Sequence, residues 1–200
     1  DRLMSRGLGD VYKRQAPDCP IVYCGNDIVA HRIGGDASGH IADSRVLVWD
    51  NFYANDYCPR RLFIGPWRRP AEASNILLNP TGLIETDKLL LEVMLIGDDV
   101  DKWRDLLGQH LPPAFFTVAY YFDAPFGFAP KFAPPPVEVA LSAVDQLLWQ
   151  WKSRLQREWY PVLMGLKQDL LIADQQMQDE RIAKTQSAAL SGALLTPPVD

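Results

Sequence analysis

The sequence predicts an α/β fold in the first half of the chain, followed by a helical region. Residues 46–49 (VLVW) are apolar throughout and include two β-branched valines, which is the pattern of a strand buried on both faces. Polar side chains follow this strand directly, where α/β folds place the residues that bind ligands. From residue 88 onward apolar residues recur at helical spacing, so the strands give way to helices.

The composition is that of an ordinary globular protein and argues against two classes of partner. The 200 residues suffice for one domain with a sizeable core, since 48% are hydrophobic and 22% charged. The net charge of −5 gives no footprint for nucleic acid, and Arg60-Arg61 and Arg68-Arg69 are interpreted as solvated loop charges. No apolar run approaches the roughly 18 residues that span a bilayer. We therefore expect no nucleic-acid partner and no membrane partner.

The cysteines and histidines indicate no metal site. Cys19, Cys24 and Cys58 lack the spacing of a disulfide scaffold, and their odd count favours a reducing compartment. The three histidines are scattered as well, and a metal needs more clustered ligands than these. We expect a cytoplasmic protein with neither metal nor cofactor.

Residues 1–15 are predicted to be a non-native leader. The run DVYKRQ at 10–15 resembles the translated adapter of a sequencing library, and such segments do not belong to a fold. The gene would then begin upstream, and the chain would be a fragment. The alternative is a native basic N-terminal arm.

Two further strands are predicted on either side of residues 46–49. Residues 21–24 (IVYC) form the first and end at Gly25, so a crossover connection must lie between Gly25 and Val46. Residues 74–78 (SNILL) form the third and close at Asn79-Pro80, while residues 58–70 are expected to turn back over the surface. Asn79 therefore repeats the polar position after a strand, although an Asn before Pro also simply begins turns.

A polar turn follows residues 46–49. Within eight positions it carries five hydrogen-bonding side chains: Asp50, Asn51, Asn55, Asp56 and Tyr57. An Asx-rich turn of purely local purpose is one interpretation, because Asn and Asp favour turns for backbone reasons. The interleaved aromatic rings favour a ligand site instead, since a plain turn does not need Trp49, Phe52, Tyr53 and Tyr57.

Helices are predicted for most of the remaining chain. Thr86-Asp87 is the expected N-cap of a helix that stops at Gly97, and Asp98-Asp99 the N-terminus of a second over 99–109. Residues 112–123 are expected to be helical too. Residues 137–178 repeat the helical pattern, and Pro161 should kink this helix or begin a new one.

Three blocks in the same order resemble glycoside hydrolase family eighty-four, the O-GlcNAcase/hyaluronidase-type β-N-acetylglucosaminidases. They are WDNFYANDY at 49–57, RRLFIGPW at 60–67 and LLNP at 77–80. The resemblance covers roughly residues 17–85 and implies the C-terminal portion of a TIM (β/α)8 barrel followed by an α-helical region. At 23–25 the sequence has Tyr-Cys-Gly where the family has Trp-Thr-Gly. The predicted organisation is a leader (1–15), a partial (β/α) barrel with following helices (16–125), a Pro-rich linker (126–136), a helical region (137–182) and a flexible tail (183–200).

The resemblance implies a retaining glycosidase that removes β-linked N-acetylglucosamine from a glycan or glycoprotein. In substrate-assisted catalysis the acetamido oxygen of the substrate attacks the anomeric carbon, and the enzyme supplies two adjacent acidic residues. In the family this pair lies upstream of the first block. The only Asp-Asp pair here, Asp98-Asp99, is interpreted as a helix N-terminus. No catalytic residue is therefore predicted, and this chain alone should be inactive.

A sugar-binding half of the site is implied as well. Asp56 would accept hydrogen bonds from sugar hydroxyls with the help of Asn79, Asn51 would hold the acetamido group, Trp49 would form an apolar wall, and Tyr57 is a further candidate. Two alternatives remain open. One is a non-catalytic carbohydrate- or partner-binding module, and the other is a different enzyme that uses Asp50 and Asp56 as acid and base.

Overall fold

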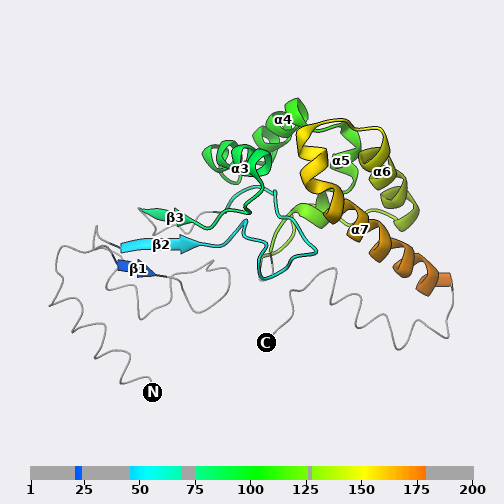
Figure 1. Cartoon of the computed structure of the whole chain (residues 1–200), viewed down its shortest axis with the longest axis horizontal. Coiled ribbons are helices and arrows are strands. Elements are labelled where there is room, and N and C mark those ends of the chain that lie inside the picture. Colours follow the sequence, from blue (N-terminus) through cyan, green and yellow to red (C-terminus); the bar gives the residue numbers. More distant parts are fainter. Residues whose placement is uncertain (1–20, 24–45, 69–74, 126–127, 179–200) are drawn as a thin grey trace, which may run out of the picture. The chain divides into compact units, whose positions relative to one another are not determined.

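The computed structural model describes residues 21–23, 46–68, 75–125 and 128–178 (Figure 1). The described residues divide into two compact units. The strand unit contains residues 21–23, 46–50 and 75–78, and the helical unit contains residues 51–68, 79–125 and 128–178. The predicted leader, the crossover after Gly25 and the predicted tail lie outside the described residues.

The strand unit is a three-stranded parallel sheet. Its strands are β1 (Ile21–Tyr23), β2 (Val46–Asp50) and β3 (Ile76–Leu78), and β2 lies between the other two. Trp49 pairs with Leu77, and Asp50 with Leu78. All three predicted strands are confirmed, with boundaries shifted by one or two residues. The barrel that the resemblance implies stays a prediction.

The helical unit consists of five α-helices and one 3₁₀ helix among its described residues. They are α3 (Ile84–Ile96), α4 (Val100–His110), α5 (Pro113–Thr117), η1 (Ala119–Phe122), α6 (Val137–Trp149) and α7 (Arg154–Gln178). The long α7 packs against α6 and α3, α5 packs against α6, and α4 contacts α3 (Figure 1). Trp103 of α4 and Trp159 of α7 are fully buried, so aromatic rings fill much of this core.

The ends of α3 and α4 can be compared with the caps that the sequence predicts for these two helices. α3 stops at Gly97, whose φ of 76° is a left-handed conformation that glycine adopts without strain. Asp99 caps α4, because its side chain accepts a hydrogen bond from the Lys102 N–H, as the sequence predicts. The predicted Thr86-Asp87 cap of α3 is wrong. The N-cap position is Leu83, which provides no side-chain hydrogen bond.

The start of α3 is instead held by a carboxylate from α7. Glu158 accepts hydrogen bonds from the backbone N–H of Glu85 and of Thr86, both at 2.9 Å, and from the Thr86 hydroxyl at 2.7 Å. Trp159 Nε1 donates to the same hydroxyl at 2.8 Å. The negative charge of Glu158 therefore lies at the positive end of the α3 dipole and satisfies donors that every helix start leaves open.

Pro161 does not begin a helix, contrary to one of its two predicted roles. The chain leaves α6 at Gln150, and α7 begins at Arg154 and continues through Pro161. Ser153 Oγ accepts the Gln156 N–H at 2.9 Å, which caps this start. The Ser-x-x-Gln spacing at 153–156 is a capping-box pattern, so a sequence signal for this boundary existed.

Residues 51–68 are named here the core loop. The surface turn predicted for residues 58–70 is wrong for residues 58–68, the part of it that the structure describes. Leu62, Phe63 and Ile64 are fully buried, as are Phe52 and Tyr53. The peptide groups of the core loop bond to distant helices, because the Ile64 N–H donates to Phe122 O and the Trp67 N–H to Gly97 O. The core loop therefore belongs to the core of the helical unit, and Phe52 and Tyr53 are core residues rather than rings that favour a ligand site.

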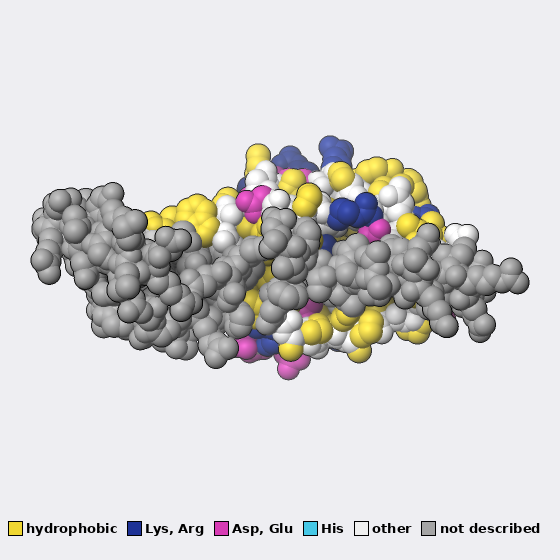
Figure 2. All heavy atoms as spheres, turned by 90° about the horizontal axis from the view of Figure 1, so that it is seen from below, with side chains coloured by type: hydrophobic (Ala, Val, Ile, Leu, Met, Phe, Trp, Pro, Cys, Tyr) yellow, Lys and Arg dark blue, Asp and Glu magenta, His cyan; other side chains and the backbone are white. Residues whose placement is uncertain are grey.

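The surface of the described part mixes apolar and charged side chains. Figure 2 shows acidic, basic and apolar groups interspersed on the visible face. Among the residues that the structure describes, the most exposed large apolar side chain is Leu95 of α3, at 90%. No helix in the described ranges combines the length and the hydrophobicity that crossing a membrane requires.

Candidate functional site

The structure brings two of the predicted sugar-binding residues together. Asn79 Nδ2 donates a hydrogen bond to Asn51 Oδ1 at 3.0 Å, although the two residues are 28 positions apart in the chain. Both side chains are half-buried. This pair is the centre of the candidate site.

Strand register explains why these two amides meet. Asp50 is the last residue of β2 and pairs with Leu78, the last residue of β3. Asn51 and Asn79 are the next residues along each chain segment, and parallel strands end at the same edge of a sheet. The prediction that a polar residue follows each of these two strands is thereby confirmed for Asn51 and Asn79, whose roles in binding stay predictions.

Asp56 and Tyr57 lie in the turn that follows Asn51. The Asp56 side chain is exposed, and its Oδ1 accepts the Tyr57 N–H at 3.0 Å. The ring of Tyr57 is half-buried and stacks on Phe63, with 6.2 Å between ring centroids and 17° between planes. The turn also holds two backbone hydrogen bonds, from the Ala54 N–H to Asn51 O and from the Cys58 N–H to Asn55 O. Asp56 therefore presents a carboxylate to solvent from a locally ordered turn.

Trp49 and Asp50 belong to the strand unit. Trp49 lies on β2 beside Leu77 and is half-buried, while Asp50 is buried at the end of the strand. Asp56 belongs to the helical unit. The roles of Trp49 as an apolar wall and of Asp50 with Asp56 as acid and base stay predictions.

Close packing inside the helical unit fixes the core loop that carries Asn51 and Asp56. The Tyr53 hydroxyl donates to Gly65 O at 2.9 Å, and Trp103 Nε1 donates to Ile64 O at 2.8 Å. A Cβ added to Gly65 would lie only 1.9 Å from the backbone oxygen of Asp123. Only glycine allows this approach, so the core loop has one position against η1 and the residues that follow it.

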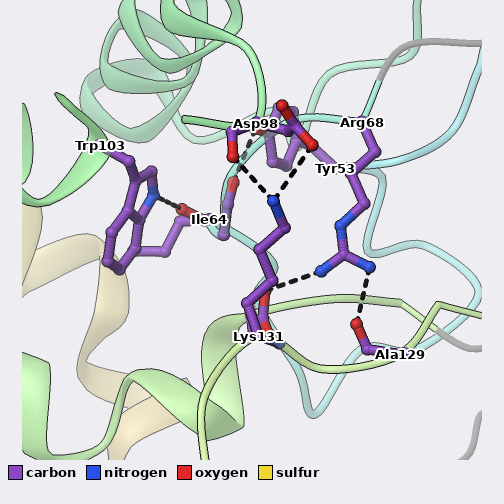
Figure 3. Close-up of polar contacts among 9 residues, drawn as sticks. Tyr53, Ile64, Arg68, Asp98, Trp103, Ala129 and Lys131 are labelled. Atoms are coloured by element: carbon purple, nitrogen blue, oxygen red, sulfur yellow. Dashed lines mark hydrogen bonds and ion pairs between the residues drawn. The ribbon is translucent and has the colours of Figure 1, made fainter. Parts of the chain in front are cut away.

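A charged cluster joins the core loop to the segment after η1 (Figure 3). Arg68 Nη2 lies 3.4 Å from Asp123 Oδ1, and its Nη1 donates to Ala129 O at 2.7 Å. The Lys131 N–H donates to the other Asp123 oxygen, while Lys131 Nζ donates to Asp98 O at 2.7 Å and Oδ2 at 3.2 Å. Residues 128–131 of the predicted linker are thus tied to both the core loop and the start of α4.

Asp123 is the buried charge of this cluster, at 0% exposure. Burial raises the pKa of its carboxyl above the ordinary value, although hydrogen bonds from Lys131 and the charge of Arg68 act in the opposite direction. Arg68, with 17% of its side chain exposed, is not the solvated loop charge that the sequence predicted.

Arg61 also differs from the sequence prediction, since it is only 9% exposed. Its Nη2 donates to Tyr121 O at 3.3 Å, and its guanidinium lies 4.7 Å from the centre of the Phe63 ring. The sequence does not show which of the two adjacent arginines, Arg60 and Arg61, is buried, and only Arg60 is exposed. The apolar residues at 62–64 were the available signal that the chain turns inward here.

No arrangement for a metal ion occurs among the residues that the structure describes. In these ranges, no three or more His, Cys, Asp or Glu side chains gather in a group that could hold one. Comparisons with models of protein families, with curated proteins and with solved structures found no match to this chain.

Proposed function

We propose that this chain carries the sugar-binding part of a glycosidase that releases β-linked N-acetylglucosamine by substrate-assisted catalysis. The observation that carries the proposal is the hydrogen bond between Asn79 and Asn51, two residues that the resemblance separately assigns to sugar binding. The exposed carboxylate of Asp56, on the turn that begins at Asn51, adds to it.

The chemistry of these groups suits an N-acetylated sugar. With its Nδ2 bonded to Asn51, Asn79 keeps a carbonyl oxygen that accepts a hydroxyl hydrogen. The carboxylate of Asp56 accepts from two hydroxyl groups at once, and such charge-assisted bonds are stronger than neutral ones. Asn51 carries the amide nitrogen that suits the acetamido oxygen, because that oxygen is an acceptor.

The proposal assigns no catalytic acid to this chain. Substrate-assisted catalysis needs two adjacent acids, one to polarise the acetamide and one to act first as general acid and then as general base. Asp98-Asp99 does not serve, since Asp99 caps α4 and Asp98 bonds to Lys131. We therefore expect binding without turnover from the chain alone.

Binding of N-acetylglucosamine, followed by saturation-transfer NMR, tests the proposal. We expect saturable binding that is weaker for glucose, which lacks the acetamido group. Asn79→Ala should raise Kd by about tenfold, because it removes one hydrogen bond of about 1.4 kcal/mol, and Asp56→Ala should raise Kd further, because it removes two charge-assisted bonds. Asp101→Ala is the matched control, since Asp101 is an exposed carboxylate in the first turn of α4. Equal binding of both sugars, or unchanged binding in both variants, would refute the proposal.

Hydrolysis of an aryl N-acetyl-β-glucosaminide separates catalysis from binding. No turnover is expected from this chain. Turnover that Asp56→Ala abolishes would show that the chain contains its own catalytic acid. Asp56 would then be a catalytic residue, as in the alternative that pairs it with Asp50. A longer chain that contains the upstream segment should hydrolyse the substrate, whereas a non-catalytic binding module would bind the sugar in both lengths and hydrolyse it in neither.

A further inference from the structure

Arg61 is a buried cation that lacks a carboxylate partner in the described part of the chain. It is nine-tenths buried, and its contacts there are the carbonyl of Tyr121 at 3.3 Å and the face of the Phe63 ring. A guanidinium has several N–H donors, and burying a charge is costly unless it is paired. One carbonyl and one ring engage only part of this donor capacity, and the remaining Arg61 nitrogens are accessible to solvent rather than sealed in the core.

A small pocket adjoins Arg61. It is lined by side chains from the core loop, from residues 121–122 and from α7: Arg60, Arg61, Leu62, Tyr121, Phe122, Val162, Leu166 and Asp169. Arg60 forms an ion pair with Asp169 across the lining, and the side chain of Arg60 is 51% exposed. Two guanidinium groups and one carboxylate therefore face the pocket, so one positive charge is unbalanced.

The neighbouring polar groups do not supply the missing negative charge. Asp123 acts on Arg61 only through space, because its oxygens are engaged by Arg68 and by the Lys131 N–H. Cys58 is close enough to interact with Arg61, but burial raises the pKa of its thiol, which therefore stays neutral at pH 7.

The volume of the pocket limits what can enter. About 20 Å³ is available, which is room for one water-sized species. A phosphate, a sulfate or a carboxylate group is larger than this, whereas a chloride ion is a single atom that is only somewhat larger than a water molecule. We propose that this pocket binds one chloride ion, held by the Arg61 guanidinium beside the Arg60–Asp169 ion pair.

Thermal unfolding of the full chain at pH 7 tests the proposal, with sodium chloride replaced stepwise by sodium gluconate at constant ionic strength. A ligand that binds only the folded state raises Tm with its concentration. At ten times the dissociation constant we expect a rise on the order of 4 °C for a domain of this size. Identical Tm values in chloride and gluconate would overturn the proposal.

Two arginine variants locate the effect. In Arg61→Met the difference between chloride and gluconate should disappear, and in Arg104→Gln it should persist. Arg104 is the matched control because it is an exposed arginine with a similar ring contact, 5.9 Å from the centre of Phe116. A chloride effect that survives Arg61→Met would place the ion elsewhere and refute the assignment.

A second measurement does not depend on the folding of the Arg61 variant. Crystals of the unaltered chain soaked in sodium bromide should show an anomalous peak beside the Arg61 guanidinium, since bromide replaces chloride. A water molecule in the pocket without a bromide peak would overturn the proposal.

Discussion

Replacing Glu158 by Ala should strongly destabilise the helical unit, because one carboxylate satisfies three donors at the start of α3. These are the N–H groups of Glu85 and Thr86 and the hydroxyl of Thr86, which is 0% exposed. A buried donor left without a partner costs about 1–3 kcal/mol, and a lost helix cap about 1 kcal/mol. Two buried Thr86 groups and the cap together give a loss of about 3–7 kcal/mol in the free energy of unfolding.

The conservative change should cost less. Glu158→Gln keeps one acceptor oxygen and removes the charge, so we expect a loss of about 1–2 kcal/mol. Urea unfolding measures both values, and a shift of the midpoint at constant slope identifies a change of stability. Hydrogen exchange of the Glu85 and Thr86 amides should also accelerate in Glu158→Ala.

A matched variant and a double-mutant cycle test whether the Glu158 carboxylate stabilises α3 through these three hydrogen bonds. Glu138 is an exposed acid in the first turn of α6, so Glu138→Ala shows the effect of a carboxylate that accepts no such bonds. Thr86→Val removes the shared hydroxyl, and its combination with Glu158→Ala should be less destabilising than the sum by about 1 kcal/mol or more. Additive losses, or a Glu158→Ala loss no larger than that of Glu138→Ala, would show that Glu158 does not cap α3.

Three further predictions concern the interior of the helical unit. Gly65→Ala should lower the free energy of unfolding by about 3 kcal/mol or more, since its Cβ would lie 1.9 Å from Asp123 O. The control Gly108→Ala, in a helix with open space around it, should raise the free energy of unfolding by up to about 1 kcal/mol. Equal effects of the two changes would contradict the close approach of Gly65 to Asp123. Burial raises the pKa of Asp123, so the contribution of the protonated carboxyl to the free energy of unfolding is complete below the ordinary pKa and is lost as pH rises through the folded-state pKa. Asp123→Asn should therefore gain stability relative to the unaltered chain as the pH is raised above about 4. Chemical unfolding at several pH values measures this, and a pH-independent difference would contradict it. Cys58 should react with a thiol reagent only on unfolding, because its thiol is buried with a raised pKa; rapid reaction of a Cys19→Ser/Cys24→Ser variant in buffer would contradict this.

The sequence predicts those features of this chain that depend on neighbours in sequence or on the regular geometry of strands. Residues 46–49 are apolar and include two β-branched valines, and they form a strand. Asn51 and Asn79 meet because each follows the end of a parallel strand, which the pattern of the two segments indicates. Asp99 caps α4 through a local bond to the Lys102 N–H, and such local capping is visible in sequence.

Features that depend on residues distant in the chain could not be predicted from local sequence patterns. α3 begins at Ile84 rather than after Thr86-Asp87, because Glu158, more than 70 residues away, replaces a local cap. Asp87 instead holds the preceding turn, accepting the N–H and the hydroxyl of Thr81 at 2.9 and 2.7 Å. Pro66 suggested a surface turn, yet the residues around it are buried because α4 and η1 supply partners for their backbone groups.

The bond between Glu158 and α3 also has a consequence for synthesis of the chain on the ribosome. The Thr86 amide is made 72 residues before the carboxylate that caps it. At about 5–20 residues per second, the interval is roughly 4–14 s. Because isolated helices of this length are marginal in water, α3 has no durable helical form during that interval. The apolar residues of α3 that the folded unit buries, Leu89, Leu90 and Val93, are then available to chaperones until α7 arrives.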